Sequence, residues 1–65
     1  MKIEKQLSQD LIYYIDHNCI QEAKETWRDY NVIIRNMHNR GLEWDSRIYF
    51  HTRQKYEKFK KDKLI

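Results

Sequence analysis

The sequence has no proline, one glycine and one cysteine among its 65 residues. Because proline is absent and glycine occurs only at Gly41, the chain has few helix breakers and its composition favours helical structure. The lone Cys19 excludes an internal disulfide and fits a reducing compartment. A domain of this size usually needs a disulfide, a metal ion, a partner or well-formed helices in order to fold. Regular helices, with or without a second copy of the chain, are what remains to stabilise the fold.

A long apolar run is also lacking. Residues 1–18 carry Glu4, Asp10 and Asp16 where a signal peptide would have an apolar segment. Nothing in the chain approaches the ~20 apolar residues that span a bilayer. We therefore expect a soluble, cytoplasmic protein with no membrane partner. At this length the chain forms one domain, residues 1–65, that buries only about 60% of its unfolded surface, so its core is marginal.

The middle of the chain has the clearest periodic pattern. Apolar residues recur there with alternating spacings of three and four, at Ile20, Ala23, Trp27, Tyr30, Ile34 and Met37. This seam predicts a helix over residues 19–40, and its central Trp27, Tyr30 and Ile34 should be the most buried residues. Asn18 is the expected N-cap, with Gln21 as its capping-box partner. Gly41 is expected to end the helix in a left-handed C′ position, with Leu42 folding back.

Two further helices are expected on either side. Asp45 should cap a helix over 46–63, and Trp44 and Tyr49 are spaced for a hydrophobic staple. The apolar stripe of that helix is Ile48, Tyr49, Thr52, Tyr56 and Phe59. A weaker stripe predicts a helix over 3–16, at Ile3, Leu7, Leu11, Tyr14 and Ile15. Because both connections are short, the sequence predicts an all-α, small three-helix antiparallel bundle.

The residue types of catalytic and metal sites are present without the usual spacing. Of the soft ligands His17, Cys19, His38 and His51, only the first two are close in sequence, and they straddle a predicted helix start. Cys19 in a first helical turn could have a lowered thiol pKa, but no glycine-rich loop accompanies it. The carboxylates of Glu22, Glu25 and Asp29 share a face with Lys24 and Arg28, which is typical of exposed ion pairs. We therefore expect no enzyme activity, no metal and no cofactor.

Positive charge is concentrated near the carboxyl end. Residues 1–46 have six Lys or Arg against eight Asp or Glu, whereas residues 47–65 have seven against two. The basic residues that surround Tyr56 and Phe59 are Arg53, Lys55, Lys58, Lys60, Lys61 and Lys63. Such a cluster can neutralise the phosphates of a nucleic acid. Cations also stabilise the carboxyl end of a helix, so nucleic-acid binding is the second of two hypotheses.

The first hypothesis comes from apolar residues that the predicted stripes do not use. They are Ile12, Tyr13, Val32, Ile33 and Phe50. A contiguous exposed patch of such residues marks an interface. We expect a small, non-enzymatic module or regulator that binds a protein through a helix face, with a homodimer as one form. Residue types with AT-rich codons make up 29 of 65 residues and those with GC-rich codons 7, so a phage or mobile element is a fitting source.

Overall fold

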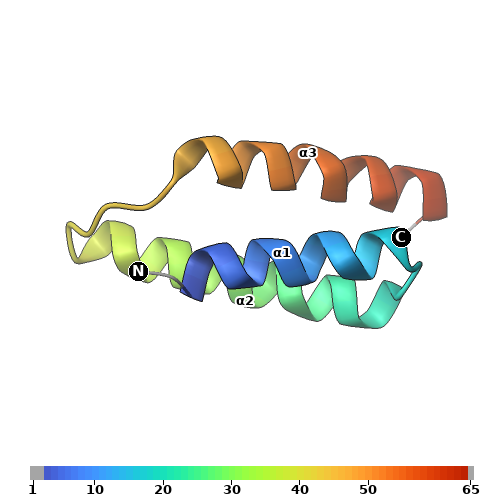
Figure 1. Ribbon diagram of the computed structural model, residues 1–65, viewed down its shortest axis with the longest axis horizontal. Helices are drawn as coiled ribbons and strands as arrows, with labels where there is room; N and C mark the ends of the chain where they lie inside the picture. Colours follow the sequence, from blue (N-terminus) through green and yellow to red (C-terminus); the bar gives the residue numbers. More distant parts are fainter. Residues whose placement is uncertain (1–2, 65) are drawn as a thin grey trace.

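The computed structural model describes residues 3–64, which form the helices α1 (Ile3–Asp16), α2 (Ile20–Asn39) and α3 (Ser46–Lys63). Consecutive helices run in opposite directions along an elongated molecule of 35 × 16 × 15 Å (Figure 1). The predicted all-α bundle is confirmed, and the helix bounds lie within one residue of those expected. No helix in this part of the chain is both long enough and apolar enough to cross a membrane.

The first helix packs closely against both of the others, whereas α2 and α3 meet mainly through aromatic rings. Trp27 of α2 stacks on Tyr56 and Tyr49 of α3, with ring centroids 4.9 and 5.8 Å apart. Such wide side chains hold the two backbones apart. The bundle is therefore organised around α1.

The core contains Tyr30 and Ile34 as expected, with 1% and 7% of their surfaces exposed, but Trp27 is only partly buried. The expectation for Trp27 was wrong because its ring covers the gap between α2 and α3 at the edge of the core, where part of it stays open to solvent. Leu11 and Ala23 are fully buried instead.

Polar side chains occupy part of the core-facing stripe of α1. Glu4 and Ser8 are buried, whereas Ile3, expected on that face, is 46% exposed. Ser8 Oγ lies 2.6 Å from Thr52 Oγ1 of α3, and Thr52 donates to the carbonyl oxygen of Ile48 at 2.7 Å. Within the described residues, every buried side-chain nitrogen and oxygen has a hydrogen-bond partner. These polar groups therefore join α1 to α3 without an unsatisfied atom.

Both connections between helices begin with the same backbone device. At the end of α2, Gly41 has φ of +71°, and the N–H of Leu42 donates to the carbonyl of Met37 at 2.9 Å, which confirms the predicted Schellman motif. At the end of α1, Asn18 has φ of +57°, and the N–H of Cys19 donates to the carbonyl of Tyr14 at 2.8 Å.

The expected role of Asn18 as N-cap of α2 was therefore wrong. Asn18 ends α1 in the left-handed conformation that asparagine tolerates better than most residues. The N-cap of α2 is Cys19, which makes no side-chain cap hydrogen bond with the described residues. Gln21 donates to Glu25 within the same helix at 3.1 Å, so it is not a capping-box partner.

The start of α3 is as predicted, with one addition from α1. Asp45 accepts a hydrogen bond from the N–H of Ile48 at 3.1 Å, and the rings of Trp44 and Tyr49 pack edge to face at 5.7 Å. The N–H of Asp45 itself donates to the carboxylate of Glu4 at 3.2 Å. In a capping box an acidic residue of the same helix fills that position. Here α1 supplies it, so the start of α3 is tied to the start of α1.

Candidate functional site

A groove with a volume of about 500 Å3 lies between the carboxyl ends of α1 and α3. Its apolar lining comes from Ile15 of α1 and Phe59 of α3. Phe59 belongs to the core and is only 5% exposed, and Ile15 packs against the same core. The groove, named here the α1–α3 groove, therefore has a floor that is continuous with the hydrophobic core.

Charged and polar side chains form the rest of the lining. Lys55, Lys58 and Lys63 contribute cations, and Asp62 and Asn18 contribute a carboxylate and an amide. Lys55, Lys58 and Asp62 are spaced by three and four residues, so they lie along one side of α3. Among the described lining residues, three ammonium groups against one carboxylate make the rim of the groove positive.

The other basic residues predicted as a nucleic-acid site do not line this groove. Arg53 donates to Glu57 one turn further on, at 3.0 Å. Lys60 lies over the ring of Tyr56, with its Nζ 5.9 Å from the ring centroid. Lys61 is exposed. The six predicted cations are thus spread around α3 and divide into three in the groove and three outside it.

The five apolar residues predicted to bind a protein do not form one patch. Tyr13, Val32 and Phe50 are 56%, 49% and 55% exposed, on three different helices. Each lies two residues from a buried position of its own helix, which is about 200° around the helix axis. They therefore point away from the core in three different directions.

The remaining two are partly buried. Ile12 lies one turn before the groove residue Ile15 on the surface of α1, and Ile33 lines a small depression of about 140 Å3 with Met37 and Leu42. Of the five, Ile12 is thus the one beside the groove. The sequence did not point to the groove because it forms between the ends of two helices that are far apart in the chain.

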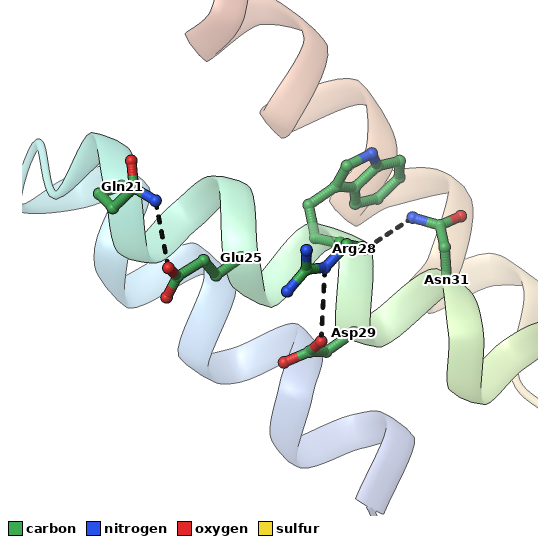
Figure 2. Close-up of polar contacts among 6 residues, drawn as sticks. Gln21, Glu25, Arg28, Asp29 and Asn31 are labelled. Atoms are coloured by element: carbon green, nitrogen blue, oxygen red, sulfur yellow. Dashed lines mark hydrogen bonds and ion pairs between the residues drawn. The ribbon is translucent and has the colours of Figure 1, made fainter.

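The exposed face of α2 carries the carboxylates that sequence analysis singled out. Glu25 accepts a hydrogen bond from Gln21, and Arg28 lies 3.9 Å from its neighbour Asp29, both well exposed (Figure 2). Exposed ion pairs were expected on this face, and the one found there among the described residues joins the adjacent Arg28 and Asp29. The face is solvated, and its carboxylates do not converge on a cleft as paired acid–base groups must.

The cysteine and the histidines, which are the residue types that bind transition metals, do not cluster. Among residues 3–64, no three His, Cys, Asp or Glu side chains are placed to hold a metal ion. The pKa of the Cys19 thiol is raised by desolvation and by the nearby Glu22 carboxylate, which is opposite to the lowered pKa considered from its position in the sequence. A raised pKa leaves less of the reactive thiolate at neutral pH.

Comparisons of the chain with protein-family models, with curated proteins and with solved structures find no match.

Proposed function

We propose that this protein is a small, non-enzymatic module that binds a segment of a protein partner in the α1–α3 groove. The observation that carries the proposal is the apolar floor formed by Ile15 and Phe59 within an open groove of about 500 Å3. Grooves of this volume accommodate ligands that bury apolar groups and orient through a few polar ones. Helix surfaces commonly bind peptides in this way.

Nucleic-acid binding remains the alternative, and the basic residues of α3 favour it. A site for phosphates alone would need no apolar floor, and readout of single-stranded bases normally uses exposed aromatic faces. Phe59 is 5% exposed, and Arg53 is engaged with Glu57. These features favour a polypeptide over a nucleic acid.

The test is affinity capture from the source cell with the full chain as bait, after nuclease treatment. Ile15→Ser removes apolar surface from the groove floor, and Val32→Ser makes a similar change on the outer face of α2. We expect a nuclease-resistant protein that the wild-type chain and Val32→Ser retain and that Ile15→Ser loses. Circular dichroism must show the same helicity in all three.

Two outcomes would contradict the proposal. Complete loss of captured material after nuclease treatment would favour the nucleic-acid alternative. Loss with Val32→Ser but not with Ile15→Ser would instead favour the outward-facing apolar residues as the protein-binding surface, as the sequence first predicted.

A further inference from the structure

We infer that the occupant of the α1–α3 groove is an acidic polypeptide segment that places one large apolar side chain on the floor and carboxylates beside the lysines. This inference rests on the proposed function and specifies the chemistry of the partner. It follows from the lining of the groove, in which cations surround an apolar floor.

The positive charge of the rim favours a partner of negative charge. Lys55, Lys58 and Lys63 are exposed and line the groove, and among the described residues of the lining Asp62 is the one acidic side chain. Oppositely charged surfaces accelerate encounter and exclude partners of the wrong sign. Residues 47–65 carry seven basic against two acidic side chains, so the surrounding surface strengthens the same preference.

The floor and the polar groups select a polypeptide rather than a polyphosphate. The floor offers apolar surface, mostly from Ile15 because Phe59 is 5% exposed, and only an apolar side chain would desolvate that surface favourably. Asp62 repels any anion placed next to it, so the carboxylates of the segment must lie beside the lysines. The Asp62 carboxylate can accept a hydrogen bond from a peptide N–H, a donor that a polyphosphate lacks. The side-chain amide of Asn18 can both donate and accept, which suits a peptide backbone.

A peptide-display selection with random 12-residue peptides tests this chemistry directly. The baits are the full wild-type chain, a groove variant Lys55→Gln/Lys58→Gln and a control variant Lys60→Gln/Lys61→Gln. Both variants lose two positive charges from the same helix, but only the first changes the groove. We expect the wild-type chain and the control to enrich peptides with several Asp or Glu around one Leu, Ile, Phe or Trp, and the groove variant to lose this enrichment.

One enriched peptide is then labelled and its affinity measured by fluorescence anisotropy between 0.05 and 0.5 M NaCl. We expect about tenfold weaker binding by the groove variant, at most about twofold by the control, and a decrease for all proteins at high salt. Asn18→Asp adds a carboxylate of similar shape at a left-handed position that aspartate tolerates, and it should weaken binding severalfold.

Several results would overturn the inference while leaving a peptide-binding function intact. They are enrichment of neutral or basic peptides, or equal binding by the groove and control variants. Recovery of no peptide at all would contradict both the inference and the proposed function.

A 20-nucleotide single strand and a 20-base-pair duplex serve as competitors. If either binds more tightly than the peptide and with the same dependence on Lys55 and Lys58, the groove is a nucleic-acid site. Light scattering of the free protein at increasing concentration tests whether a second copy of the chain occupies the groove. Self-association that the groove variant abolishes would identify a second copy of the chain and overturn the inference.

Discussion

The two helices that pack against α1 do so through different chemistry. The contact with α2 is mainly apolar, and Leu11, Ala23 and Ile34 belong to one core cluster. The contact with α3 also contains the Ser8–Thr52 hydroxyl pair and the hydrogen bond from Asp45 to Glu4. Apolar burial stabilises without direction, whereas hydrogen bonds require particular atoms to meet. The first contact therefore supplies stability, and the second also fixes the position of α3 along α1.

The largest expected effect comes from the aromatic contact between α2 and α3. Trp27→Ala removes the ring that stacks on Tyr49 and Tyr56. Core aromatic-to-alanine changes cost about 3–5 kcal/mol, and partial burial of Trp27 places the expected loss near the lower end. In so small a domain this leaves much of the protein unfolded.

Urea denaturation followed by circular dichroism measures this loss. The control is Val32→Ala on the exposed side of α2, which should change the free energy of unfolding by less than about 0.5 kcal/mol. A Trp27→Ala midpoint equal to that of the wild type would show that α3 is held by its contacts with α1 alone.

The next effect is a loss of stability at high pH. Burial, together with the nearby Glu4 carboxylate, raises the pKa of Tyr30 to about 12, from an ordinary value of 10.0. Above pH 10 the unfolded chain ionises this phenol and the folded chain does not. The stability from Tyr30 is therefore fully present below pH 10 and is lost as the pH rises toward 12, by at most roughly 2–3 kcal/mol.

Urea midpoints between pH 8 and 11.5 should fall for the wild type and fall less for Tyr30→Phe. Burial also raises the pKa of Tyr56, so some slope should remain in that variant. A slope that Tyr30→Phe does not reduce would contradict the burial of this hydroxyl beside the polar contacts of α1.

The hydroxyl pair between α1 and α3 gives an effect of intermediate size. Because Thr52 donates its only hydroxyl proton to Ile48, the Ser8 hydroxyl is the donor between Ser8 and Thr52. Thr52→Val leaves Ser8 buried without its acceptor, at a cost of about 1–3 kcal/mol. Ser8→Ala in the same chain removes the unsatisfied group, so the double variant should be more stable than Thr52→Val. A double-mutant cycle measures this coupling, and additive changes would mean that the pair does not join the helices.

Much of the fold follows from local sequence signals. The seam through Tyr30 and Ile34, the end of α2 at Gly41 and the cap at Asp45 were all predictable, because each depends on residues within a few positions of one another. The role of Asn18 was predicted wrongly because asparagine is favourable both as an N-cap and at a left-handed C′ position, and the local sequence does not distinguish the two roles.

The tertiary features were not predictable in the same way. Glu4, Ser8 and Leu11 are separated by four and three residues, which is the spacing of a core stripe. Glu4 and Ser8 are polar, however, and sequence alone does not reveal that Thr52 and the N–H of Asp45 are their hydrogen-bond partners. The groove between Ile15 and Phe59 depends on how α1 and α3 lie side by side. No spacing within either helix contains that information.

The smallest expected changes in stability come from substitutions in the two turns that precede and follow α2. Gly41 and Asn18 both have positive φ, but glycine adopts this conformation freely and asparagine does so at a modest cost. Apart from Gly41 itself and its two chain neighbours, no described residue has an atom within 4 Å of where a Cβ on Gly41 would be, so the penalty at that position comes from the backbone. Gly41→Ala should therefore lower the free energy of unfolding by about 1 kcal/mol, Gly41→Val by more, and Gly41→Asn by only a few tenths.

Asn18→Gly should have a free energy of unfolding within a few tenths of a kcal/mol of the wild type, because relief of the backbone strain is offset by a more flexible unfolded chain. Thermal melts of these four variants rank the two turns, and equal stability of Gly41→Val and Gly41→Asn would mean that α2 continues into α3 without a left-handed residue.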